Sequence, residues 1–152
     1  MLKELLPRNH IRCTTAPASW QEAIRLAAAP LLDCGAILPS YVDAMIRSVE
    51  ENGPYIVIDE NFAMPHARPE AGAVRPCMAL TILDRPIDMC GQSVQVLLAL
   101  SATDNTSHLD AMRELAELIW NGCSASVLAG AASPEDAMAI IERTLSSMQP
   151  SV

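Results

Sequence analysis

A histidine between two prolines is the residue of this chain best placed for chemistry. His66 stands in the string Ala-Met-Pro-His-Ala-Arg-Pro-Glu, residues 63–70, where Pro65 and Pro69 restrict the backbone. A neutral imidazole is a good nucleophile toward phosphorus, and the N–P bond that it forms is reactive enough for the phosphoryl group to be passed on. Arg68 could balance the charge of that group. The string is therefore compatible with a phosphoryl carrier, although position alone leaves an incidental loop histidine open.

A second histidine stands where a helix is predicted to begin. His108 follows Ser107, a typical N-cap residue, shortly after an apolar run that ends at Leu100. Helix N-termini offer unpaired N–H groups to anions, and ligands gather at strand ends in α/β sheets. If the predicted strands that end at Ile58 and Leu100 are neighbours, the two imidazoles converge at one edge of the sheet. Spacing alone would also fit a His108 with no functional role. We interpret His10, the third histidine, as incidental.

The elements that must position these residues are four helices around a strand-rich centre. Periodic apolar residues with capping signals predict helices from Ser19 to a stop at Pro30 and Gly35, from Ser40 to Gly53, from Ser107 to Gly122 and from Ser133 to Ser147. Apolar, β-prone runs predict strands over 55–58, 77–83 and 94–100, with turns at 84–86 and 90–92. Runs this apolar suit strands covered on both faces. The pattern indicates a layered α/β or α+β domain with its sheet between helices.

Composition limits the classes of protein that remain. The 152 residues are 51% hydrophobic and 18% charged, which indicates one globular domain. A net charge of −8 argues against nucleic acid as a partner and favours a basic one. We see neither a stretch long enough to span a bilayer nor a secretion signal, so we expect a cytoplasmic protein with no direct membrane insertion. Five scattered cysteines, with no Cys-x-x-Cys pair, predict neither a disulfide framework nor a zinc site.

Several strings together resemble one known family. They are Gly-Pro-Tyr-Ile-Val-Ile at 53–58, Pro-His-Ala-Arg-Pro-Glu at 65–70, Asp-Asn-Thr-Ser-His-Leu at 104–109 and Leu-Ala-Glu-Leu at 115–118. In this order they resemble the enzyme IIA domains of the bacterial sugar phosphotransferase system (PTS), within the mannitol/fructose-type superfamily and its ascorbate-type branch. The resemblance covers nearly the whole chain. It places one EIIA type-2 domain over residues 1–147 and a C-terminal tail over 148–152.

The resemblance implies a fold and a reaction. The fold is a three-layer α/β sandwich with a mixed central sheet flanked by helices on both faces. His66 would accept a phosphoryl group from the histidine phosphocarrier protein HPr and donate it to a cysteine of an enzyme IIB, with a membrane enzyme IIC acting only later. His108 would help to hold the phosphoryl group, with possible support from Arg68 and Ser107. Neither a metal nor an organic cofactor is required, and an ascorbate-like substrate is the expectation for this branch.

The chain also departs from the family pattern. The mannitol branch has an arginine upstream of its histidine motif, where an ungapped comparison places Glu50 and a shifted one places Arg47, so we transfer no role to Arg47. The region Met89-Cys90-Gly91 and the remaining thiols match no family motif, and we interpret them as structural.

Three alternatives remain open at this point. A regulatory EIIA-like phosphoacceptor would use the same histidine to control other proteins, and the absence of neighbouring enzyme IIB and IIC genes would favour it. A metal-dependent hydrolase would use His66 and His108 with Asp59 or Asp104, although a His-Glu-x-x-His motif is missing. An interaction module without chemistry would not be phosphorylated by any carrier.

Overall fold

The structure is a computed structural model that describes residues 2–148, with the side chains of residues 2, 3, 105, 107 and 108 left aside. Its helices are α1 (Leu2–Leu5), α2 (Trp20–Asp33), α3 (Pro39–Asn52), α4 (Asn105–Trp120), α5 (Ala125–Ala129) and α6 (Pro134–Met148), with the 3₁₀ turns η1 (Arg8–His10) and η2 (Pro69–Ala71). Its strands are β1 (Ile11–Thr14), β2 (Val57–Asp59), β3 (Asn61–Ala63), β4 (Cys77–Met89) and β5 (Gln92–Ser101).

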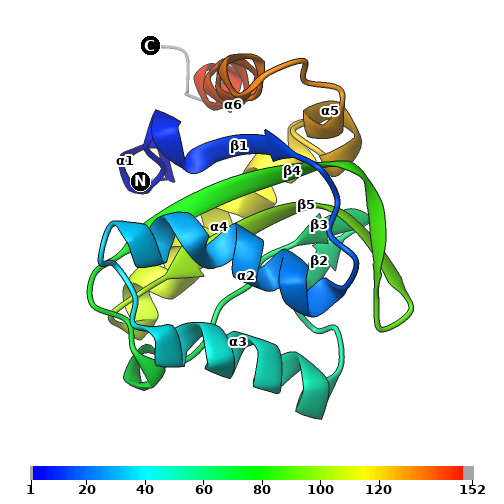
Figure 1. Ribbon diagram of the computed structural model, residues 1–152. Helices are drawn as coiled ribbons and strands as arrows, with labels where there is room; N and C mark the ends of the chain where they lie inside the picture. Colours follow the sequence, from blue (N-terminus) through cyan, green and yellow to red (C-terminus); the bar gives the residue numbers. More distant parts are fainter. Residues whose placement is uncertain (1, 149–152) are drawn as a thin grey trace.

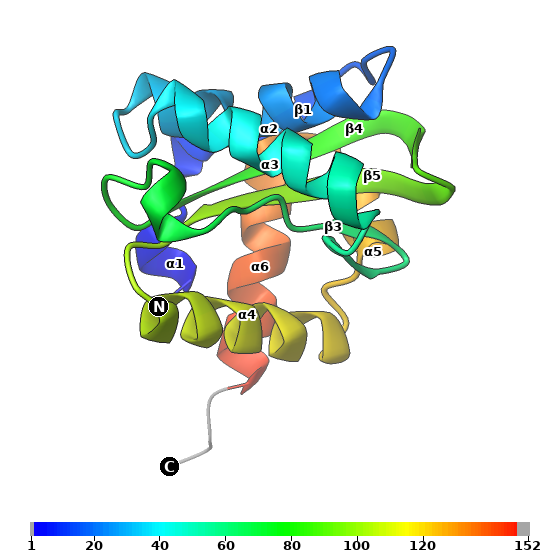
Figure 2. The ribbon, with the colours of Figure 1, turned by 90° about the horizontal axis from the view of Figure 1, so that it is seen from below.

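One mixed sheet lies between two layers of helices. The strand order is β1-β4-β5-β3-β2, in which β1 pairs parallel with β4, and β3 parallel with β5. Figure 2 shows α2 and α3 on one side of the sheet, and α1, α4 and α6 on the other. The predicted three-layer sandwich with a mixed sheet is confirmed.

The long strands β4 and β5 explain how the sheet holds both layers. Their side chains alternate between the two faces, and every side chain of residues 77–83 and 96–101 is buried, as expected for strands covered on both sides. Toward α2 and α3 point Ala79, Leu83, Leu97 and Ala99. Toward α4, α5 and α6 point Met78, Leu80, Ile82, Val96, Leu98 and Leu100. Together these two faces make the core, and they fix the direction of β5, whose end lies beside His66.

Proline does not end the first predicted helix, which corrects the sequence interpretation. Pro30 is buried inside α2, and the helix runs on to Asp33 (Figure 1). A proline in a helix leaves the carbonyl four residues earlier without its N–H donor, here the carbonyl of Leu26. Arg12 of β1 replaces that donor, because its Nη2 donates to Leu26 O and also to Thr81 Oγ1 at 3.2 Å. The helix continues because a distant strand satisfies its open carbonyl.

Other boundaries of helices, strands and turns also differ from the predicted ones. The predicted turn at 84–86 is wrong, because β4 runs through it with a register shift between Ile82 and Ile87. The turn at 90–92 is confirmed as a two-residue hairpin, with positive φ at Cys90 and Gly91 and Gln92 already in β5. Helix α3 begins at Pro39, not Ser40, and α4 begins at Asn105. The elements β1, β3 and α5 were not predicted.

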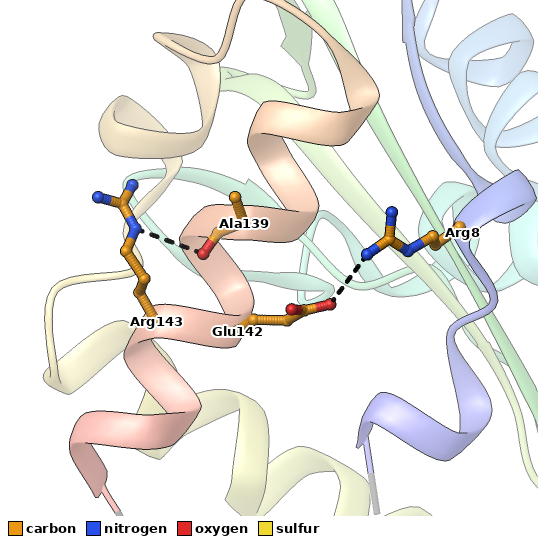
Figure 3. Close-up of polar contacts among 4 residues, drawn as sticks. All are labelled: Arg8, Ala139, Glu142 and Arg143. Carbon is orange, nitrogen blue, oxygen red and sulfur yellow. Dashed lines mark hydrogen bonds and ion pairs between the residues drawn. The ribbon is translucent and has the colours of Figure 1, made fainter.

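The N-terminal segment is held against α6 by a surface ion pair. Figure 3 shows Arg8 of η1 reaching Glu142, with Nη2 and Oε1 3.6 Å apart, beside Arg143, whose Nε–H donates to Ala139 O at 3.4 Å. The Arg8 side chain is 73% exposed, so this pair contributes little to stability.

None of the described helices combines the length and the apolarity that crossing a membrane requires.

Candidate functional site

His66 lies just beyond the end of β3, beside the end of β5. The backbone keeps its pairing with β5 after the strand ends, because Leu100 N–H donates to Pro65 O at 3.0 Å. The His66 ring turns back on its own segment, and its Nδ1 lies 2.7 Å from Met64 O. A carbonyl only accepts, so Nδ1 carries the proton in this contact and Nε2 carries the lone pair. If His66 acts as a nucleophile, this contact leaves Nε2 as the nitrogen that can attack.

The strand before His66 differs from the predicted one. Residues 55 and 56 lie in a turn, β2 covers Val57–Asp59, and a further strand, β3, leads to the histidine. The strand predicted to end at Ile58 corresponds to β2, which pairs with β3 and does not neighbour β5, so the expected pairing is wrong for that strand. The unpredicted strand β3 is the one that pairs directly with β5. Because these two strands are parallel, their carboxyl ends meet at one edge of the sheet.

An aromatic ring supports the imidazole from the side. Tyr55 meets His66 edge-on, with ring centroids 5.8 Å apart and an angle of 84° between the planes. Its hydroxyl is 2.8 Å from Ser48 Oγ of α3. Tyr55 thus links the third helix to the histidine, and it remains 47% exposed.

A cleft of about 650 Å³ opens between α3 and the segment that carries His66. Two arginines line it, Arg47 from α3 and Arg68 from the His66 segment, and Glu51 lies on the same helix face as Arg47. Both guanidinium groups are permanently charged, and each offers several N–H donors to phosphate oxygens. The imidazole of His66 and two cationic side chains thus line one open cleft, and such a lining suits an anionic group.

Buried Tyr41 fixes the segment after His66. Its hydroxyl accepts from Ala67 N–H at 3.1 Å and lies 2.9 Å from Leu100 O and 3.1 Å from Ala67 O, to which it can donate. Burial raises the pKa of Tyr41 above its usual value, which keeps the hydroxyl protonated as a donor. A single α3 side chain therefore ties β5 to the segment that carries His66.

The loop is closed by backbone contacts around Gly72. Leu38 N–H donates to Gly72 O at 2.9 Å, and Ser40 Oγ donates to Ala71 O at 2.7 Å. Ser40, where the helix was predicted to begin, thus contacts η2 through its side chain. Gly72 has a φ of +135°, and a Cβ there would lie 2.7 Å from Ser40 Oγ and 3.3 Å from Tyr41 N.

A Gly72→Ala variant is therefore expected to lose about 1–3 kcal/mol of unfolding free energy, because the side chain adds backbone strain and a clash with α3. Chemical denaturation measures the loss. Gly91→Ala is the matched control, since Gly91 also has a positive φ, +92°, but no atom within 4 Å of an added Cβ. Equal losses in the two variants would show that the contact with Ser40 is unimportant.

The helix that carries the second predicted histidine starts at the same edge. Helix α4 begins at Asn105, four residues after β5 ends at Ser101. The side chains of Ser107 and His108 lie outside the described residues, so their meeting with His66 stays a prediction. Among the described side chains, His66, Asp59 and Asp104 belong to no group with metal-ligand spacing, so nothing in that part of the chain supports the hydrolase alternative.

Sequence reasoning missed Tyr41 and Tyr55 and named Arg47 without assigning it a role. A further signal for Arg47 existed. Ala44, Arg47, Ser48 and Glu51 recur at helical spacing on one face of α3, and all four line the cleft. That stripe could have been recognised as a polar face opposite the buried one.

Comparisons with known proteins agree with this geometry. The family profile described as the phosphoenolpyruvate-dependent sugar phosphotransferase system, EIIA 2, matches residues 4–144. The mannitol-specific cryptic phosphotransferase enzyme IIA component of Escherichia coli K12 is 35% identical over 93% of this chain and 98% of its own. An ascorbate-specific PTS EIIA component of Mycoplasma pneumoniae is 33% identical over 77% of this chain and 76% of its own.

Solved structures share the fold. The solution structure of the mannitol-specific cryptic enzyme IIA from Escherichia coli has a TM-score of 0.84 at 34% identity and covers 93% of this chain and 98% of its own. The complex of enzyme IIA and phosphorylated enzyme IIB for mannitol from Escherichia coli has a TM-score of 0.78, covering 91% of this chain and 99% of that one. Its identity is 19%, so it supports the fold alone.

Proposed function

Because this chain belongs to the EIIA 2 family of the phosphoenolpyruvate-dependent sugar phosphotransferase system, we propose that it carries a phosphoryl group on Nε2 of His66. The group would come from phosphorylated HPr and pass to a cysteine of an enzyme IIB. The observation that carries the proposal is the hydrogen bond of Nδ1 with Met64 O at 2.7 Å, in a cleft that also holds Arg47 and Arg68. That bond leaves the lone pair on Nε2.

The transfer requires positioning and charge neutralisation. In the first step the His66 Nε2 lone pair attacks phosphorus in line as the N–P bond of the phosphorylated HPr histidine breaks. That histidine enters the step with its other ring nitrogen protonated, so HPr leaves with a neutral imidazole. In the second step a thiolate of enzyme IIB attacks the same phosphorus and the His66 N–P bond breaks. Loose phosphoryl-transfer transition states spread charge over the equatorial oxygens, which Arg47 and Arg68 would neutralise. His108 and the N–H groups at the start of α4 would add to this from the other side.

The rim of the cleft suits protein partners. Tyr55 and Ile58 are large apolar residues that are 47% and 37% exposed. Ile58 also lines a neighbouring groove of about 390 Å³ with Met112 and Trp120. Exposed apolar side chains beside a reactive group favour docking of a protein surface over entry of a free sugar. The electrostatics agree, because a chain with net charge −8 attracts basic partner surfaces.

Transport is the favoured context, in the cytoplasm beside a membrane enzyme IIC. Relatives above 30% identity bear transport names, specific for mannitol or for ascorbate. We propose an ascorbate-like substrate for the system, because the strings at 53–58 and 65–70 resemble that branch.

A two-stage experiment tests the proposal. The chain is incubated with phosphoenolpyruvate, enzyme I and HPr, and intact mass spectrometry is expected to find one added phosphoryl group that acid removes and peptide mapping assigns to His66. The purified phosphorylated chain is then mixed with ascorbate-type and mannitol-type enzyme IIB, and faster transfer to the ascorbate-type protein is expected. An acid-stable label, or one on another residue, defeats the phosphohistidine. Faster transfer to the mannitol-type protein overturns only the substrate.

A further inference from the structure

Three potential metal ligands from distant parts of the chain meet beneath the sheet edge. His10 is the last residue of η1, Cys34 is the C-cap residue of α2, and Cys77 is the first residue of β4. One ligand atom of each, a ring nitrogen or a sulfur, lies within 4.8 Å of the other two. His10 and Cys77 are only 6% exposed, whereas Cys34 is partly exposed. The cluster is thus buried on two sides and reachable from the third.

We propose that His10, Cys34 and Cys77 bind one zinc ion. Two sulfurs and an imidazole form a ligand set that binds Zn²⁺ in preference to hard cations. A water molecule would be the fourth ligand. The site uses no residue of the His66 cleft, so it goes beyond phosphoryl transfer. It would give Cys34 and Cys77 a role that the sequence analysis, which interpreted these thiols as structural, did not expect.

The distances within the cluster already suit a tetrahedral ion. With Zn–N near 2.05 Å and Zn–S near 2.3 Å, tetrahedral angles put the nitrogen and each sulfur about 3.6 Å apart, and the two sulfurs about 3.8 Å apart. His10 Nδ1 and Cys77 Sγ are 3.6 Å apart. The limit of 4.8 Å on the remaining pairs leaves only small side-chain movements to reach these values.

Charge also favours a divalent ion over bare thiolates. Burial and the neighbouring Cys34 together raise the pKa of Cys77 to about 11, so the Cys77 thiol is protonated at neutral pH. A divalent ion displaces both thiol protons, and with two thiolates and a neutral imidazole the site has no net charge. Such a neutral unit tolerates burial far better than a single thiolate.

Zinc binding would change one of the hydrogen bonds around the cluster and leave the others in place. His10 Nδ1–H donates to Met78 O at 2.9 Å, so coordination through Nδ1 moves that proton to Nε2 and opens this bond. The outer contacts stay in place, since Arg75 Nη1 donates to Cys34 O at 2.9 Å and Ser101 Oγ donates to Arg75 O at 2.7 Å. Such outer partners orient the ligands of metal sites. The ion would clip η1, α2 and β4 to one another.

Cobalt substitution tests the site directly on the full chain, reduced and stripped of metal. Co²⁺ is expected to bind at one equivalent with thiolate-to-cobalt charge-transfer bands and the strong visible bands of four-coordinate cobalt, and Zn²⁺ is expected to bleach both. Zinc binding at neutral pH is expected to release about two protons per ion. A reduced chain that shows no charge-transfer band and takes up no Zn²⁺ overturns the proposal, whatever the variants do.

Matched cysteine variants identify the ligands. Cys34→Ser and Cys77→Ser are each expected to lower Zn²⁺ affinity at least about 10-fold. Cys13→Ser and Cys90→Ser change exposed thiols outside the cluster and are expected to leave the affinity unchanged. Equal affinities in all four variants contradict the assignment. His66→Ala is expected to keep the cobalt spectrum, so failure of the zinc site and failure of the phosphoryl carrier remain distinguishable.

Discussion

A His66→Ala variant is expected to accept no phosphoryl group from phosphorylated HPr, with a rate more than about 10⁴-fold below that of the parent chain. Alanine removes the nucleophile itself, and no other described imidazole lines the cleft. Quench-flow labelling followed by mass spectrometry measures the rate. Because His66 is only partly buried and bonds to its own segment through Met64 O, its loss is expected to leave the fold intact, which circular dichroism checks.

The control for this variant is another histidine. His10→Gln keeps an amide donor toward Met78 O and lies outside the cleft, so it is expected to accept the phosphoryl group at the parent rate. Full labelling of the His66→Ala variant, or loss of labelling in His10→Gln alone, would move the carrier to another residue.

The parts of the fold that sequence predicts are those whose cause is local. The continuous apolar runs of β4 and β5 follow from burial on both faces, so both strands were found from those runs. Ser19 was found as a cap because its hydroxyl accepts from Glu22 N–H within the same turn, at 3.2 Å. Such signals depend on residues only a few positions apart.

The features of the fold that the sequence failed to predict depend on partners that are distant in the chain. Pro30 stays inside α2 only because Arg12 of another element donates to Leu26 O. The strand β3 has three residues and exists through its pairing with β5. A three-residue strand carries no periodicity of its own, so a single sequence offers nothing to detect.

The residues of the candidate site also fall into those predicted from local sequence and those placed by distant contacts. His66 and Arg68 lie in one string and were found together. Tyr41 and Arg47 belong to α3, and what brings them to the cleft is the bond of Tyr41 with Leu100 O together with the contacts of Ser40 and Leu38 with η2. The sequence shows a helix with a buried face, but not which loop that helix holds.

Substitution of Arg47 or Arg68, the two arginines of the cleft, is expected to have the second large effect on phosphoryl transfer. Arg47→Ala and Arg68→Ala are each expected to slow phosphoryl acceptance about 10- to 100-fold, and the double variant about 10²- to 10³-fold, because each removes a charged donor from a group that gains negative charge. The measured quantity is the single-turnover rate from phosphorylated HPr at fixed ionic strength. Arg85→Ala, an exposed arginine of β4 outside the cleft, is the matched control and is expected to keep the parent rate.

Three readouts separate contact with the phosphoryl group from docking of HPr. If both guanidinium groups hold the same phosphoryl group, the double variant slows the reaction by less or more than the product of the single effects, since residues that share a partner are coupled. Arg47→Lys keeps the charge without the planar pair of donors, so it is expected to recover only part of the rate. If the arginines act only on encounter, saturating HPr restores the parent rate in every variant. Full recovery at saturation would therefore contradict their place beside the transferred group.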